Sequence, residues 1–134
     1  MTFGPPEGTA PLAAEQVRPG EQTWRVVRDL VTYGSALEVV KDLGEVRFPD
    51  IDWSLRRRAE ERYSWVGDDV TSARGDARWT MRVARGTWSA ETRTATALTC
   101  TPRTFVLHAT QDAYEGDRRV DARTWNVEVP RDHV

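Results

Sequence analysis

The side chains best suited to chemistry in this sequence are Glu61, Tyr63 and Arg123. A carboxylate and a phenol can exchange protons with a substrate, and an arginine can stabilise an enolate or another anion. Alternation along the predicted strands puts all three on one face, with Glu61 and Arg123 near strand ends. We therefore predict Glu61 or Tyr63 as an acid/base group and Arg123 as an anion stabiliser. The alternative is that these are ordinary charges at a solvated rim.

Alternation places a row of small side chains on the same face as Trp88, and this arrangement suggests a binding cavity. The small residues are Ala90, Thr92, Thr94 and Thr96. A close-packed core rarely holds a row of threonines, because each buried hydroxyl needs a partner. In a cavity, small residues leave volume, hydroxyls orient the ligand, and aromatic rings form flat walls. The predicted lining residues are Trp65, Trp79, Met81, Trp88, Thr92, Thr94, Phe105 and Trp125. The alternative is that the aromatic residues simply fill a core.

Composition excludes several classes of protein. The chain has 134 residues, the length of a single domain. Its net charge is −2, whereas nucleic-acid-binding proteins usually carry an excess of basic residues. Cys100, His108 and His133 are its only cysteine and histidines, so Cys₂His₂ and Cys₄ zinc sites are ruled out. We therefore predict no metal, no cofactor and no nucleic-acid partner.

The sequence also lacks familiar catalytic and targeting signals. It contains no G-x-S-x-G, P-loop, G-x-G-x-x-G or H-E-x-x-H motif. His108 alternates away from Phe105 and Leu107, and Cys100 has no histidine nearby in sequence, so neither is predicted as catalytic. No apolar run is long enough to span a membrane, and the N-terminus does not read as a signal peptide. We therefore expect a cytoplasmic protein with no membrane partner.

The elements that must position these residues are β-strands. A Pro/Gly-rich leader over 1–20, with a turn of helix at 12–17, precedes a single β-domain over 21–134. The predicted strands cover 23–31, 36–41, 45–48, 59–66, 77–85, 87–99, a segment from 105, and 119–129. Turns are predicted at 33–35, 42–44, 101–103 and 114–117, and a loop at 67–76. Helical spacing is the alternative for 54–66.

Sequential strands joined by short turns predict an antiparallel meander. Such a meander closes most easily as an up-and-down, lipocalin-like β-barrel or a strongly curved sheet, and a two-sheet β-sandwich is the alternative. The predicted interior face carries Trp79 and Trp88, joined by Trp65 and Trp125. Trp24 and Trp53 are not assigned to a face.

Ordered fragments of the chain resemble a known family. They are ERYSWVGDDVTSARGDARWTM (61–81), RGTWSAETRTATALTCT (85–101), DAYEGDRRV (112–120) and RTWNVEVPRDHV (123–134), with RPG (18–20) and VVRDL (26–30) upstream. These are similar to the region that follows the jelly-roll domain in α/β-hydrolases of the cocaine-esterase and X-Pro dipeptidyl-peptidase family. The segment 69–72 departs from the Asp-Pro-Leu-Ser type turn expected there. The family's catalytic residues lie in a domain that this chain lacks, so the resemblance implies hydrolase ancestry and not hydrolase activity.

Two functions follow as hypotheses. In the first, which we favour from sequence, the chain is a binding barrel for an apolar or aromatic small molecule, a cyclase or isomerase of bacterial secondary metabolism. In the second, it is a non-catalytic accessory module that packs on an α/β-hydrolase or on another copy of itself as a homodimer. An enclosed pocket would favour the first hypothesis, and an exposed apolar strip on one sheet face would favour the second.

Overall fold

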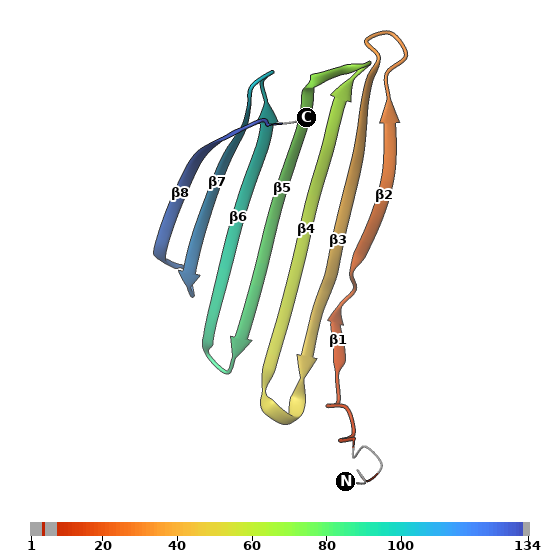
Figure 1. The fold of residues 1–134 in the computed structure, drawn as a ribbon. Coiled ribbons are helices and arrows are strands. Elements are labelled where there is room, and N and C mark those ends of the chain that lie inside the picture. The colour runs from red at the N-terminus through yellow and green to blue at the C-terminus, as the bar shows by residue number, and fades with distance from the viewer. Residues whose placement is uncertain (1–3, 5–7, 133–134) are drawn as a thin grey trace.

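The computed structural model describes residue 4 and residues 8–132, and this part of the chain forms one antiparallel sheet (Figure 1). A short 3-10 helix, Pro49–Ile51, joins β3 to β4. The strands are β1 (Glu15–Arg18), β2 (Glu21–Arg28), β3 (Gly34–Phe48), β4 (Trp53–Val66), β5 (Asp69–Arg85), β6 (Trp88–Cys100), β7 (Thr104–Glu115) and β8 (Arg118–Pro130). The predicted all-β meander is confirmed.

The strands follow the order β1-β3-β4-β5-β6-β7-β8, and β2 also pairs with β3. Strands β1 and β2 therefore share one edge of the sheet, and β8 forms the other (Figure 1). Among the described residues no strand pairing joins these two edges, so the sheet stays open. The strongly curved sheet is thus the predicted form that occurs, and neither a hydrogen-bonded barrel nor a second sheet is present in this part of the chain.

The strand register separates the side chains into two faces, because successive residues of a strand point to opposite sides. On β5, Trp79 and Met81 share one side and Arg78 and Thr80 the other, as predicted. Antiparallel partners share a face, so the pairs Ala59–Trp79 and Trp79–Thr94 extend this division to β4 and β6.

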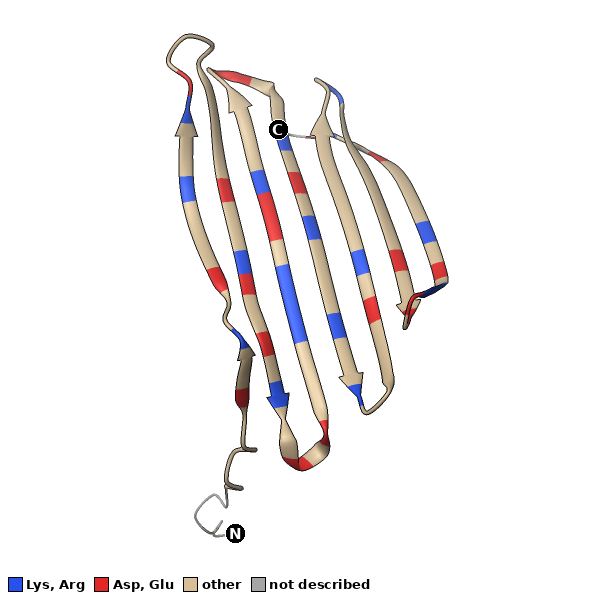
Figure 2. Cartoon of the chain, turned by 180° about the vertical axis from the view of Figure 1, so that it is seen from behind, with Lys and Arg blue, Asp and Glu red and all other residues tan. Residues whose placement is uncertain are grey.

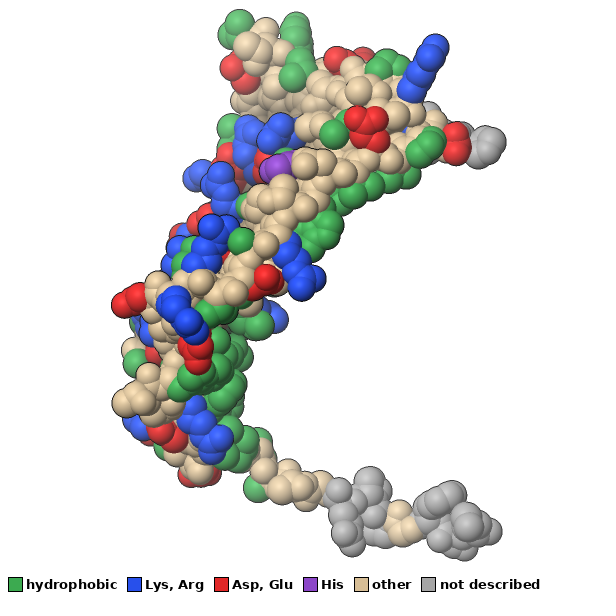
Figure 3. All heavy atoms as spheres, turned by 90° about the vertical axis from the view of Figure 1, so that its left-hand side faces the viewer, with side chains coloured by type: hydrophobic (Ala, Val, Ile, Leu, Met, Phe, Trp, Pro, Cys, Tyr) green, Lys and Arg blue, Asp and Glu red, His purple; other side chains and the backbone are tan. Residues whose placement is uncertain are grey.

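We call the first side the aromatic face. Its members include Trp24, Leu37, Val39, Trp53, Ala59, Glu61, Tyr63, Trp65, Trp79, Met81, Trp88, Thr92, Thr94, Phe105, Leu107, Arg123, Trp125 and Val127. Viewed from the β8 edge, hydrophobic side chains line the concave side of the molecule, and most charged side chains lie on the convex side (Figure 3).

We call the opposite side the charged face. Its members include Arg25, Glu38, Asp42, Arg58, Glu60, Arg62, Asp76, Arg78, Arg93, His108, Thr110 and Asn126. Positive and negative positions follow each other along its central strands (Figure 2). Many of these charges form ion pairs, such as Arg25 with Glu38 at 2.7 Å and Arg74 with Asp76 at 2.6 Å. Exposed pairs of this kind each stabilise a fold by less than about 1 kcal/mol.

The segment 42–44, predicted as a turn between two strands, is instead a β-bulge inside β3. Asp42 pairs with Arg58 and Glu45 with Arg56, so β3 carries one extra residue at this point. The predicted strands at 36–41 and 45–48 are therefore one long strand. Gly44 adopts a φ of +70°, which explains why the sequence reads locally as a turn.

Other boundaries also differ from prediction: the strand predicted over 23–31 ends at Arg28, and the turn predicted at 33–35 lies earlier, because β3 begins at Gly34. The strand predicted over 59–66 is confirmed but begins at Trp53, and the predicted loop at 67–76 shrinks to a two-residue turn before β5 begins at Asp69. The helical turn predicted at 12–17 is wrong, because Glu15–Arg18 forms β1 and pairs with β3. Part of the predicted leader, 1–3 and 5–7, lies outside the described residues.

The sheet has almost no enclosed core. Its only fully buried apolar residues among those described are Ala36, Val39 and Ala59. Large apolar side chains stay exposed instead, Trp24 at 64% and Met81 at 46% among them. The accessible surface is 10253 Å², whereas a compact monomer of this mass exposes about 7100 Å².

No helix in the described part of the chain is long and apolar enough to cross a bilayer.

Candidate functional site on the aromatic face

All of the residues predicted from sequence as catalytic or ligand-binding lie on the aromatic face. Strand β4 carries Glu61, Tyr63 and Trp65, and β8 carries Arg123 and Trp125. The remaining predicted residues come from the strands between them: Trp79 and Met81 on β5, Trp88, Thr92 and Thr94 on β6, and Phe105 on β7. Sharing a face does not bring them to one point, because the sheet is broad and open.

Glu61 and Tyr63 are in contact. The Tyr63 hydroxyl donates a hydrogen bond of 3.2 Å to Glu61 Oε2, and Lys41 Nζ lies 3.8 Å from the same oxygen. Partial burial raises the pKa of Tyr63, and the negative charge of Glu61 raises it further. A phenol with a raised pKa stays protonated at neutral pH, so Tyr63 can donate a hydrogen bond but is a weak acid.

Arg123 does not join this pair. Three strands, β5, β6 and β7, separate β4 from β8, a distance of roughly 19 Å along the sheet at about 4.8 Å per strand. Its guanidinium lies 3.3 Å from Asp121 on its own strand. An acid/base pair and an anion stabiliser must contact the same substrate. At this separation, only a large substrate could contact both Glu61 and Arg123.

The coupling of Tyr63 to Glu61 has a measurable consequence. We expect Tyr63 to ionise above its ordinary pKa of 10.0, and Glu61→Gln to lower that pKa by removing the nearby negative charge. A pH titration of tyrosinate absorbance in a Tyr33→Phe/Tyr114→Phe background would isolate the one remaining phenol. Glu60→Gln, on the opposite face, is the control. A Tyr63 pKa that Glu61→Gln leaves unchanged would contradict the contact.

A shallow groove of about 430 Å³ crosses one end of the aromatic face. Tyr63, Trp65, Leu98 and Phe105 form its walls, and Gly75 lies beneath the Tyr63 ring. The groove includes Trp65 and Phe105 from the predicted lining set. It does not include Trp79, Met81, Trp88, Thr92, Thr94 or Trp125, which lie elsewhere on the same face.

Two tryptophans that sequence reasoning left unassigned belong to this face as well. The Trp53 and Trp88 rings lie 6.3 Å apart, and Lys41 Nζ lies 5.0 Å from the Trp24 ring. All six tryptophans therefore share one side of the sheet. The face of Trp24 and Trp53 could not be predicted from alternation. Trp24 precedes two adjacent valines that interrupt the alternating pattern, and Trp53 directly follows a turn.

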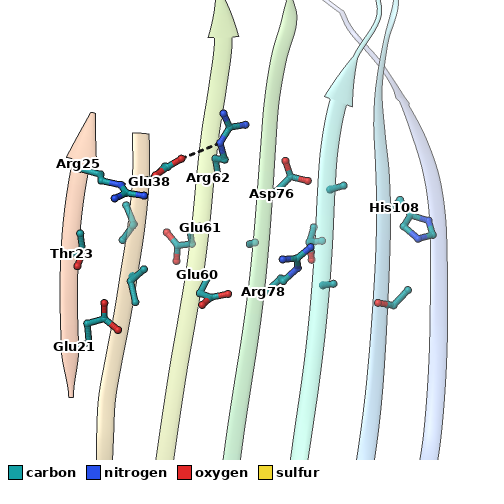
Figure 4. A pocket seen from close by; sticks show the side chains of 17 residues that line it. Glu21, Thr23, Arg25, Glu38, Glu60, Glu61, Arg62, Asp76, Arg78 and His108 are labelled. Atoms are coloured by element: carbon teal, nitrogen blue, oxygen red, sulfur yellow. Dashed lines mark hydrogen bonds and ion pairs between the residues drawn. The ribbon is translucent and has the colours of Figure 1, made fainter. Parts of the chain in front are cut away.

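The charged face has a larger hollow, of about 650 Å³ (Figure 4). Small side chains such as Ala95 and Ala97 lie at its floor, and charged side chains of both signs surround them. Glu38 accepts hydrogen bonds from Arg25 and Arg62, on the strands to either side. The described residues contain no cluster of histidine, cysteine and carboxylate groups suited to a metal ion.

His108 and Cys100 lie on opposite faces of the sheet, and Cys100 pairs with Phe105 at the edge of the groove. His108 is on the charged face, as predicted, where its Nδ1 lies 2.6 Å from Asn126 Oδ1. Cys100 Sγ lies 3.3 Å from the Val70 carbonyl oxygen and 3.8 Å from Arg131 Nη1. His133 lies outside the described residues. A serine or cysteine nucleophile with a histidine base is therefore not assembled in the part of the chain that the structure describes.

Comparisons of the chain with protein-family models, with curated proteins and with solved structures find no match.

Proposed function

We propose that this chain is a non-catalytic accessory module whose aromatic face packs against another protein surface. The observation that carries the proposal is the gathering of all six tryptophans on one side of an uncovered sheet, five of them 39–64% exposed and Trp53 half-buried. Continuous exposed apolar surfaces of this extent mark interaction sites. Tryptophan and tyrosine are also the residues that dominate the energetics of protein interfaces.

The open sheet supports this function over the small-molecule barrel. A ligand-binding barrel surrounds its ligand and buries most of the ligand's surface. Here the groove beside Tyr63 is open along one side, and Arg123 is remote from Glu61. The threonines of β6 need no ligand to explain them, because on an open face their hydroxyls can hydrogen-bond to water.

The resemblance to the C-terminal region of α/β-hydrolases supports the same function. In that view a separate catalytic domain would supply the nucleophile, acid and base, and this sheet would contribute a surface. The charged face would stay in solvent, where its ion pairs are compatible with water. The chain itself would bind and position a partner and would perform no chemical step.

The proposal is tested by probing the aromatic face and the catalytic capacity of the chain separately. At nanomolar chain concentration, we expect the dye ANS to fluoresce on the wild-type protein, with energy transfer from tryptophan. Met81→Lys, on the aromatic face, should lower that emission severalfold, because a charge interrupts the apolar surface. Thr80→Lys, its neighbour on the charged face, is the matched control and should leave the emission unchanged.

Two results would overturn the proposal. One is stoichiometric labelling of a serine by a fluorophosphonate, because this would reveal a serine hydrolase. The other is the absence of ANS emission together with saturable one-to-one quenching of tryptophan by a small aromatic ligand, because this would reveal an enclosed binding site.

A further inference from the structure

The area, shape and charge of the aromatic face indicate which partner covers it. Resting on the accessory function proposed above, we propose that this partner is a second copy of the chain. The two aromatic faces would pack against each other about a two-fold axis, so that two single sheets form one double-layered β-structure.

The exposed area fits such a dimer. The accessible surface of 10253 Å² exceeds that of a compact monomer of equal mass by about 3100 Å². Obligate homodimers bury about 2000–5000 Å² in total, or about 1000–2500 Å² per protomer. The excess exposed surface of one chain is therefore large enough for the interface of a stable dimer.

The shape of the sheet fits as well. The aromatic face lies on the concave side of the sheet (Figure 3). The twist of adjacent strands gives such a sheet the form of a saddle, concave along one diagonal and convex along the other. Two identical saddles nest when one is turned by about 90°, which is the geometry of orthogonally packed sheets.

Three cations on the aromatic face already have partners, and Arg28 and Arg85, at the ends of β2 and β5, would lie at the rim of the interface. Lys41 already lies 3.8 Å from Glu61, and Arg123 lies 3.3 Å from Asp121. The Arg57 guanidinium lies 5.9 Å from the Trp79 ring. Each of these three cations has a partner within its own chain, so burial by a second copy would not leave them unpaired.

An edge-to-edge dimer through β8 is the competing arrangement. It would satisfy the free backbone groups of that edge strand. It would leave the tryptophans on β2 and β4, far from that edge, as exposed as they are in a single chain. The face-to-face arrangement covers the larger and more apolar surface, and we therefore infer that arrangement.

The first test is the mass of the full chain in solution. Sedimentation equilibrium at micromolar concentration should give twice the 15.2 kDa of one chain. Met81→Lys should raise the dimer dissociation constant by at least about 100-fold, because it buries an unpaired charge in the interface. Thr80→Lys should leave the constant unchanged. Far-UV circular dichroism would verify that both variants keep the sheet.

The second test locates the interface without disturbing it. In a Cys100→Ser background, Thr94→Cys places a thiol near the centre of the aromatic face, and Ala95→Cys places one on the charged face of the same strand. Packed sheets lie about 10 Å apart, so a short bismaleimide should link two chains through position 94 and not through position 95.

The outcomes separate this inference from the accessory function. A wild-type chain of 15.2 kDa at all concentrations, or a dimer that links through position 95 and survives Met81→Lys, would overturn the second copy as partner. The ANS experiment would then still judge the accessory function by itself, since it reports whether the aromatic face of one chain is an accessible apolar surface.

Discussion

Replacing Asp42 by alanine is expected to lower the free energy of unfolding by about 3 kcal/mol. The carboxylate of Asp42 is 2% exposed and lies at the bulge of β3. It accepts a hydrogen bond of 2.7 Å from the Gly44 backbone N–H and bonds of 3.0 Å from both Arg18 and Arg58. Without it, two guanidinium groups lose their shared partner, and β1 keeps only its backbone pairing and the Gln16 bonds to β3.

Urea denaturation at fixed protein concentration would measure this change, because the stability of an associating protein depends on its concentration. Asp76→Ala is the matched control. It removes an exposed carboxylate paired with Arg74 and should change the free energy of unfolding by less than about 1 kcal/mol. Equal losses in the two variants would contradict the role assigned to Asp42.

The same carboxylate gives the stability a defined pH dependence. Burial acts to raise the pKa of Asp42, but the bonds from Gly44, Arg18 and Arg58 outweigh it and lower the pKa to about 2. A lowered pKa in the folded state stabilises the protein above the unfolded value of 3.8. That contribution is lost as the pH falls from about 4 through about 2. Asp42→Asn should lack this step in a plot of unfolding free energy against pH.

Replacing Gly44 by alanine should be at least as damaging, with an expected loss of about 3 kcal/mol or more. A Cβ at this position would lie 2.0 Å from the Arg18 carbonyl oxygen and 2.7 Å from the Pro19 carbonyl carbon. Both contacts are with backbone, which cannot move aside as a flexible side chain can. The φ of +70° adds the strain that any L side chain incurs there.

Gly116→Ala separates the two causes in the same urea experiment. Gly116 has a φ of +56°, but a Cβ there would meet nothing within 4 Å. This variant should lose only the conformational term, about 1 kcal/mol. If Gly44→Ala is no worse than Gly116→Ala, the close approach between the bulge and the segment joining β1 to β2 does not matter for stability.

The alternation of residues was sufficient to predict β6 and the second half of β5, 77–85, because strand parity there does not depend on distant contacts. The first half of β5, 69–76, was predicted as a loop because its sequence does not alternate clearly. Alternation also placed Glu61 and Tyr63 together, since residues two apart on a strand always share a face. The bulge at Asp42 was not predictable, because Asp-Leu-Gly favours a turn equally well. Its strand conformation depends on Arg18 and Arg58, which are distant in the sequence.

Closure of the sheet was beyond the reach of the sequence for a related reason. A barrel requires strand tilt, register shift and edge strands that match one another. Each of these depends on all the strands together. The position of Arg123 relative to Glu61 depended on that closure, so the predicted catalytic set separated when the sheet stayed open. The predicted aromatic residues remained on one face because strand parity alone decides it.

The meander of neighbouring strands makes this molecule a linear array. In the described chain the main contacts join strands that lie side by side, so no distant element clamps the two ends of the sheet together. Its unfolding cooperativity then comes from nearest-neighbour interactions, because each strand is stabilised by the strand next to it. Strands β1, β2 and β8 each pair with a single neighbour, and β8 is exposed along its whole length. Opening should therefore begin at these edges and move inward, and a cover laid across the aromatic face would join all the strands into one cooperative unit.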